Sequence, residues 1–191
     1  MGRILFILRE VFCAAILLLP VFLVLNRRLF RDGKKTAAYF LFACYLAAVY
    51  ALVGLPNVTY VRLELKLNWI PFMGMIGDLK NSILNVALFL PLGMFLPVLW
   101  KKYRVMKRTV FFGFGLSLAI ELLQILTLRA TDVNDLITNT VGTALGFLLS
   151  RCVRSRGGEQ HRELYLLLAV TFGVMFFVHP FLSNLAWKLL N

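Results

Sequence analysis

Two polar side chains interrupt an apolar segment of this sequence that is otherwise suited to a membrane. Glu121 and Gln124 are three residues apart, so they share one face of a helix, and Ser117 lies one turn away on that face. An ionisable group inside an apolar segment is costly to bury, which makes Glu121 a candidate functional residue. A hydrogen bond to a neighbouring helix is the structural alternative, with Glu121 protonated or paired across the interface.

A second polar stripe follows in the next segment. Asp132, Asp135, Asn139, Gly142 and Gly146 recur at spacings of three and four residues, so they lie on one helix face. Asp132 is a good N-cap, and Asp135 is an acid in the first turn, where the helix dipole favours negative charge. The two glycines form a small-xxx-small pair that would let another helix approach closely. Capping and packing therefore compete with ligand binding as explanations of this stripe.

A third polar group lies near the start of an earlier apolar segment. Asn81 and Asn85 are one helical turn apart, and Pro91 and Gly93 follow them. A proline inside a helix frees a backbone carbonyl, which a membrane tolerates only where protein or water is close. A local kink is the structural alternative. We therefore take Asn85 as a ligand-binding candidate, and Pro91 and Gly93 as structural residues.

The composition indicates that membrane-spanning helices carry these polar residues. The chain has 191 residues, of which 60% are hydrophobic, and its mean hydropathy is +0.81, well above that of a soluble domain. A spanning helix needs about 20 mostly apolar residues. We predict an all-α, polytopic transmembrane helix bundle of about six spans, forming a single membrane domain over residues 1–191. The spans are Ile4–Leu25, Thr36–Leu55, Ile83–Trp100, Thr109–Leu128, Leu136–Ser150 and Leu164–Leu182. Arg9 interrupts the first span, and we expect its side chain to reach toward the interface.

The net charge of +12 is concentrated in the loops after the first, third and fifth spans. Basic loops stay on the cytoplasmic side, so we predict a multi-pass protein of the bacterial cytoplasmic membrane with these loops inside. The loop 56–82 is then extracytoplasmic, and the alternating pattern of residues 61–69 predicts a strand lying on the bilayer surface or pairing with another chain. Because no basic stripe is interleaved with stacking aromatics, we expect no nucleic-acid partner.

This topology places the polar groups of three spans at a similar depth on the outer side. A carboxylate or amide facing lipid is costly, so each must find a partner or water. We predict that these side chains line one shared cavity open to the outer face, with Arg129 at its rim. The predicted lining residues are Asn85, Glu121, Gln124, Asp132, Asp135 and Asn139.

Four short motifs resemble those of the VanZ-like family, in the order in which that family has them. They are Asn68-Trp-Ile-Pro71-Phe, Asn85 to Gly93, Glu121-Leu-Leu-Gln124, and Arg129 to Gly146 with its Thr-Asp-Val-Asn-Asp run. The resemblance covers residues 68–151, a core that leaves out the first and last spans, and it adds Asn68 as a binding candidate and Pro71 as a structural residue. It implies a membrane protein of a family linked to low-level resistance to teicoplanin, a lipidated glycopeptide that acts outside the cell.

Three functions fit the polar residues. The first is binding or modulation of a membrane lipid, a lipid-linked envelope molecule or a lipoglycopeptide in the outer-leaflet pocket, since amides offer both donors and acceptors. The alternative is an intramembrane carboxylate-dependent enzyme acting on a lipid-linked envelope substrate, with Glu121, Asp132 and Asp135 in acid–base roles. The third is a small transporter coupled to protons through Glu121, which no inverted repeat supports. His161 and His179 fall outside the polar set, and no metal-ligand spacing appears, so we expect no metal and no cofactor. The oligomeric state stays open.

Overall fold

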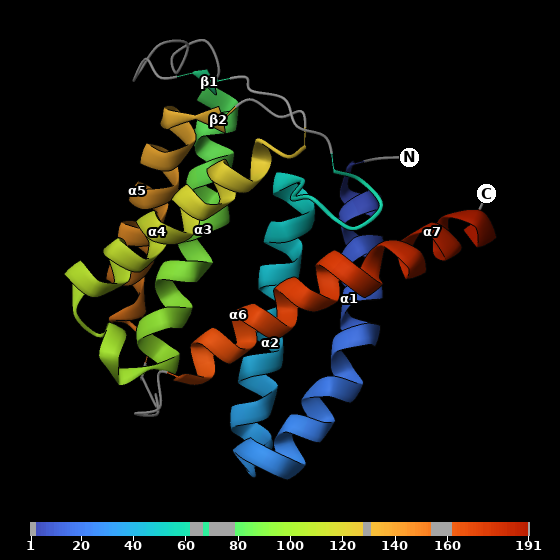
Figure 1. Ribbon diagram of the computed structural model, residues 1–191. Coiled ribbons are helices and arrows are strands. Elements are labelled where there is room, and N and C mark those ends of the chain that lie inside the picture. Colours follow the sequence, from blue (N-terminus) through green and yellow to red (C-terminus); the bar gives the residue numbers. More distant parts are fainter. Residues whose placement is uncertain (1–2, 62–66, 69–78, 128–130, 154–161, 191) are drawn as a thin grey trace. The chain divides into compact units, whose positions relative to one another are not determined.

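The computed structural model describes residues 3–61, 67–68, 79–127, 131–153 and 162–190 (Figure 1). Most of these residues are helical, which confirms the predicted all-α class. The chain forms two compact units: unit 1 holds Met1–Val61 and Arg162–Asn191, and unit 2 holds Arg62–His161. That residues 1–191 act as a single membrane domain stays a prediction.

Unit 1 begins with a helical hairpin. Helix α1 (Arg3–Leu25) runs into a π-helical turn, η1 (Asn26–Phe30), and α2 (Gly33–Val53) follows. The Asp32 side chain caps α2 by accepting hydrogen bonds from two backbone N–H groups of its first turn, at 2.9 and 3.2 Å. Gly54 ends α2 with φ 64°, a left-handed conformation that suits glycine at a helix end.

The C-terminal part of unit 1 is helical with one π-helical interruption. It consists of α6 (Arg162–Gly173), η3 (Val174–Val178) and α7 (His179–Leu190). Glu163 in the first turn of α6 forms an ion pair with Lys35 of α2 at 2.7 Å and accepts a hydrogen bond from the Tyr39 hydroxyl at 2.5 Å. These contacts join α6 to α2 at one end of the unit.

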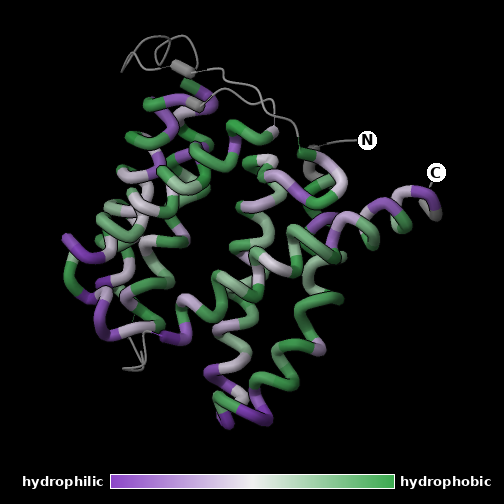
Figure 2. The backbone as a smooth tube through the Cα atoms, viewed as in Figure 1, coloured by the Kyte–Doolittle hydropathy of each residue, from purple (hydrophilic) through white to green (hydrophobic). Residues whose placement is uncertain are grey.

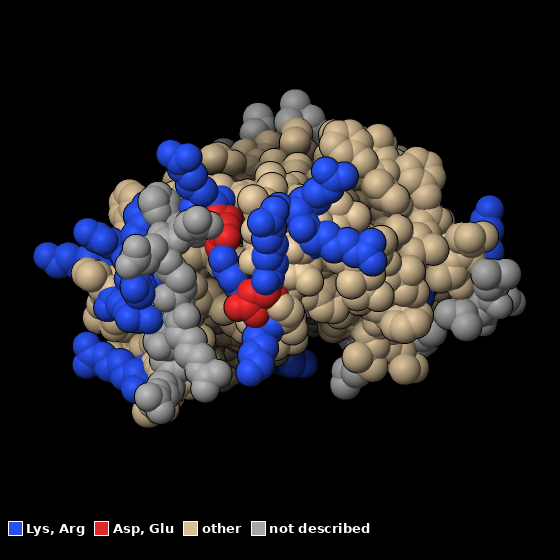
Figure 3. Space-filling model, turned by 90° about the horizontal axis from the view of Figure 1, so that it is seen from below, with Lys and Arg blue, Asp and Glu red and all other residues tan. Residues whose placement is uncertain are grey.

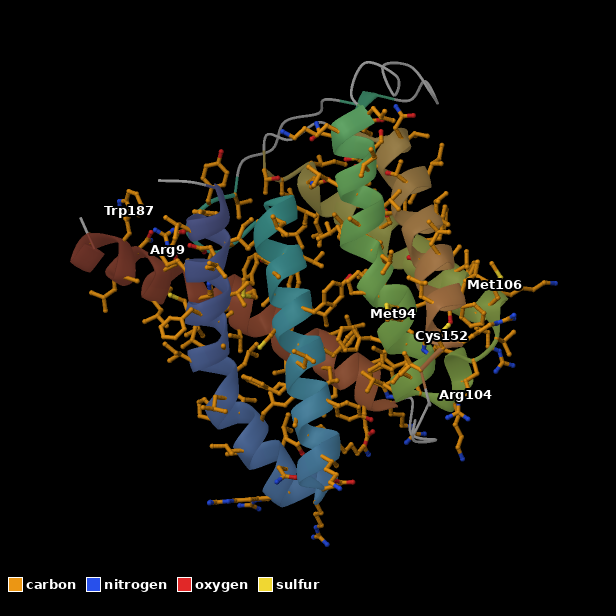
Figure 4. All side chains as sticks on the ribbon, turned by 180° about the vertical axis from the view of Figure 1, so that it is seen from behind. Arg9, Met94, Arg104, Met106, Cys152 and Trp187 are labelled. Carbon is orange, nitrogen blue, oxygen red and sulfur yellow. The ribbon has the colours of Figure 1, made fainter. Side chains whose placement is uncertain are left out.

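A buried polar cluster joins α1 to α7 within unit 1. The Arg9 guanidinium donates to the Glu10 carboxylate at 2.6 Å, and its carbon lies 4.9 Å from the centre of the Trp187 ring (Figure 4). The Ser183 hydroxyl also donates to Glu10, at 2.7 Å, and a ring nitrogen of His179 lies 3.0 Å from the Glu10 backbone oxygen. Arg9 is thus held by partners inside unit 1, and the expectation that its side chain reaches the membrane interface stays a prediction.

Unit 2 contains three long helices. They are α3 (Leu79–Leu99), α4 (Met106–Gln124) and α5 (Val133–Ser150), with a short 3₁₀ turn, η2 (Lys101–Tyr103), between the first two. Figure 1 shows α3 and α5 side by side, with α4 crossing them obliquely. Contacts of α3 with α5 advance in register along both helices, so the two helices run in the same direction, and α4 returns in the opposite direction.

Glycines bring α3 and α5 into backbone contact. A Cβ at Gly142 would overlap the carbonyl oxygen of Val86, and one at Gly146 would overlap that of Leu90. From the other side, a Cβ at Gly93 would lie 2.8 Å from the backbone nitrogen of Phe147. Small residues at such a contact let helices approach to a distance that larger side chains prevent.

Four helices of the described part of the chain are long and apolar enough to cross a membrane: Leu5–Phe30, Gly33–Val53, Leu79–Leu99 and Arg162–Lys188. They correspond to the first, second, third and sixth of the predicted spans. Helices α4 and α5 are not among these four. Helix α4 carries the charged residues Lys107, Arg108 and Glu121, and α5 carries Asn134, Asp135 and Asn139. Figure 2 shows hydrophobic colour along α1 and α2 and hydrophilic colour at the turn between these two helices.

The strand predicted at residues 61–69 exists over two described residues. Strand β1 (Leu67–Asn68) pairs in parallel with β2 (Thr131–Asp132), with Leu67 opposite Thr131 and Asn68 opposite Asp132. The partner is therefore a segment of the same chain and not a second chain. A position on the bilayer surface stays a prediction. The pairing brings the segment that holds Asn68 to the start of α5.

Candidate functional site

The start of α5 is fixed by two carboxylates. Asp132 is the N-cap and accepts a hydrogen bond from the backbone N–H of Asn134 at 2.8 Å. The backbone N–H of Asp132 in turn donates to the Glu121 carboxylate of α4 at 3.0 Å. Glu121 is buried, with 3% of its surface exposed, so the carboxylate that accepts this hydrogen bond lies inside unit 2.

A direct contact also joins α3 to α5. The Asn85 amide donates to the Asp135 carboxylate at 2.7 Å, near the beginning of both helices. Both side chains are half-buried, as is Asp132. These three residues therefore form a partly accessible polar rim. We call this rim, together with the buried residues Glu121 and Asn139, the polar end of unit 2.

Asn139 lies deeper and joins α5 to α4. Its amide nitrogen is 2.9 Å from the Ser117 hydroxyl oxygen, and both residues are buried. Its amide oxygen has no hydrogen-bond partner among the residues that the structure describes. Exchanging the amide oxygen and nitrogen would pair the oxygen with Ser117 and leave the nitrogen unpaired instead. In either orientation, one buried polar atom of Asn139 has no hydrogen-bond partner among the described residues.

Other polar residues of this region serve the helices themselves. Thr138 and Thr143 donate to backbone carbonyls of the preceding turn of α5, at 2.9 and 3.0 Å. Gln124 is buried at the end of α4, and its backbone carbonyl accepts a hydrogen bond from the Thr127 hydroxyl. Asn134, which is 6% exposed, was not among the residues predicted from the sequence. Its position two residues after the N-cap Asp132 could have indicated its hydrogen bond to that cap.

The structure thus brings together residues of all three predicted segments. Asn85, Glu121 and Asn139 each form a hydrogen bond to another helix or to its N-cap. For Glu121 this is the structural alternative that the sequence left open. Pro91 is half-buried within α3, and Gly93 is buried against α5. Several other candidates are less fully placed. Asn68 is described through its backbone in β1, and Arg129 and Pro71 lie outside the described residues.

The chemistry of the polar end is dominated by acceptors. Glu121, Asp132 and Asp135 contribute carboxylates, and Asn85 and Asn139 contribute amides. Such a set suits a ligand that brings hydroxyl, amide or ammonium donors. Among the described residues, no group of three His, Cys, Asp or Glu side chains has the arrangement of a metal site.

Known proteins resemble this chain over its central part. The family model described as VanZ/LLP1 matches residues 40–154. A curated relative, Protein VanZ of Enterococcus faecium, is 40% identical over 84 residues, which is 44% of this chain and 51% of that protein. The match therefore spans about half the length of this relative. No solved structure matches the chain significantly.

Proposed function

Since the chain belongs to the VanZ/LLP1 family, and its unit 2 gathers carboxylates and amides at one end, we propose that this polar end binds the head group of a cell-envelope molecule in the membrane. The ligand is a lipid-linked envelope molecule or a lipoglycopeptide of the teicoplanin type. The observation that supports this most is the half-buried pair of Asn85 and Asp135, which lies beside the buried residues Glu121 and Asn139.

The charges of unit 2 support an outward-facing site. The polar end contains the starts of α3 and α5 and the end of α4. The opposite ends of these helices lead to Lys101, Lys107 and Arg151. Because basic loops remain in the cytoplasm, the polar end faces the outer leaflet of the cytoplasmic membrane, where lipid-linked envelope molecules and lipoglycopeptides are found.

The acceptor-rich composition defines the ligand class. Sugar hydroxyls and ammonium groups donate hydrogen bonds, which carboxylates accept strongly because they are charged. The acyl or prenyl part of such a ligand stays in the bilayer, so only the head group must enter the protein. Both the lipid-linked saccharide and the lipoglycopeptide have this division into an apolar anchor and a donor-rich head.

The test is equilibrium binding of teicoplanin to the full chain in lipid nanodiscs. The deacylated core of teicoplanin is measured in the same way as a comparison ligand. Asn85→Leu removes one partner of Asp135 and adds bulk at the rim, and we expect the affinity to fall by about tenfold, as for a charge-assisted hydrogen bond. Ala87→Leu adds the same side chain at an exposed position of α3 and is the matched control. Equal affinities of Asn85→Leu and the unmodified chain would contradict the proposal.

One observation favours the enzyme as the second candidate: Glu121 is buried and bonded to the start of α5, two features common in catalytic carboxylates. Glu121→Gln keeps an oxygen that can accept from the Asp132 backbone, so the fold and the binding of a head group should persist. An enzyme would lose turnover in this variant, whereas a binding protein would keep its affinity. Conversion of a lipid-linked substrate by the unmodified chain, abolished in Glu121→Gln, would establish the enzyme.

A further inference from the structure

A groove lies on α4, in the half of the helix that is remote from Glu121. It is shallow and open to the outside, with a volume of about 620 Å³. It is lined by Met106, Lys107, Val110, Phe111, Phe114 and, from α5, Thr140. The lining of the groove shares no residue with the polar end of unit 2.

The wall of the groove is hydrocarbon. Met106, Val110 and Phe114 follow each other at four-residue spacing and form one row on α4, and Phe111, which is 76% exposed, lies in the adjoining row. The hydroxyl of Thr140 donates to a backbone carbonyl of its own helix at 2.7 Å, so its donor is already used. Such a wall suits an acyl chain and offers no donor to a polar ligand.

The mouth of the groove is cationic. Lys107 is exposed and has no hydrogen-bond or ion-pair partner in the part of the chain that the structure describes. Residues 99–114 contain five Lys or Arg residues and no Asp or Glu. Figure 3 shows Lys and Arg side chains gathered over this part of unit 2, and Figure 4 places Arg104 and Met106 on the segment that enters α4. The charge at this end is therefore uncompensated by acids of the same segment.

We propose that this groove binds an anionic phospholipid of the surrounding bilayer. One acyl chain lies along the row of Met106, Val110 and Phe114, and the phosphate pairs with the Lys107 ammonium. The two halves of the site match the two chemistries of the lipid, since an apolar wall takes the chain and a cationic mouth takes the phosphate. A zwitterionic lipid also has a phosphate, but it carries no net negative charge to balance the basic residues at this mouth, and a helix of a second copy would bring no phosphate.

Native mass spectrometry of the full chain in detergent, titrated with lipid, tests the proposal. The probes are phosphatidylglycerol and phosphatidylcholine with identical acyl chains, and glycerol phosphate without a chain. We expect tighter binding of phosphatidylglycerol than of either other probe. Lys107→Gln should weaken phosphatidylglycerol about fivefold, the effect of one cation at an anionic lipid surface, and weaken phosphatidylcholine by less. Lys34→Gln, at an exposed lysine of unit 1, is the matched control.

A second variant tests the apolar wall. Val110→Trp fills the groove and should weaken both phospholipids, whereas Leu122→Trp, at an exposed position of the same helix, should not. Lys107→Gln alters an exposed side chain and carries the test even if Val110→Trp does not fold. Equal binding of the two phospholipids to the unmodified chain would overturn the proposal. Binding of glycerol phosphate as tight as that of phosphatidylglycerol would also overturn it. So would a dimer of the chain that Val110→Trp abolishes while lipid binding is unchanged. Asn85→Leu should leave this binding intact, which separates it from the proposed function.

Discussion

Replacing Gly146 by alanine should destabilise unit 2. A Cβ at this position would overlap the carbonyl oxygen of Leu90 and lie 2.9 Å from its carbonyl carbon and 3.0 Å from the Cα of Gly93. All three obstacles are backbone atoms, so relief requires α3 and α5 to move apart. Overpacking costs ~1–3 kcal/mol, and the better helix propensity of alanine returns at most ~1 kcal/mol. We expect the free energy of unfolding to fall by roughly 1–2 kcal/mol.

Gly115→Ala is the matched control for this change. A Cβ at Gly115 of α4 would meet nothing within 4 Å, so this variant should gain up to ~1 kcal/mol from helix propensity alone. Both variants are unfolded by titration with a denaturing detergent, and the loss of helix is followed by circular dichroism. The opposite sign of the two effects is the signature of backbone contact between α3 and α5. If Gly146→Ala is as stable as Gly115→Ala, that contact is absent.

In a chain whose two helix-embedded cysteines are replaced by alanine, an impermeant maleimide added to intact cells should label Thr59→Cys and leave the exposed Cys152 unlabelled, because the positive-inside rule predicts a cytoplasmic position for the basic loop after α5. Labelling of Cys152 alone would reverse the topology. Glu10→Leu should lower the free energy of unfolding by up to about 3 kcal/mol, since it leaves the half-buried Arg9 guanidinium without its counter-ion. Ser183→Ala should cost only about 1 kcal/mol, and equal losses in the two variants would refute a central role for this ion pair.

Local rules in the sequence predicted the parts of unit 2 that depend on neighbouring residues. The start of α5 at Asp132 follows from N-cap chemistry, and the structure places the cap there. The three- and four-residue spacing of Asp135, Asn139 and Gly142 identified one helix face, which packs against α3 and α4.

Contacts between distant residues could not be predicted in the same way. Glu10 and Ser183 are separated by 173 positions, so no periodicity connects them, and Arg9 lacked a visible partner in the sequence. The alternating pattern around Leu67 indicated a strand but not its partner, because pairing with Thr131 depends on how α3, α4 and α5 pack.

We propose that the polar end of unit 2 holds the head group of a lipid-linked envelope molecule. Mass spectrometry of the lipids that co-purify with the full chain tests this proposal. The unmodified chain and Ala87→Leu should retain an envelope lipid with a hydroxyl- or amine-bearing head group, and Asn85→Leu should lose it. Identical lipid profiles for all three chains would contradict the claim.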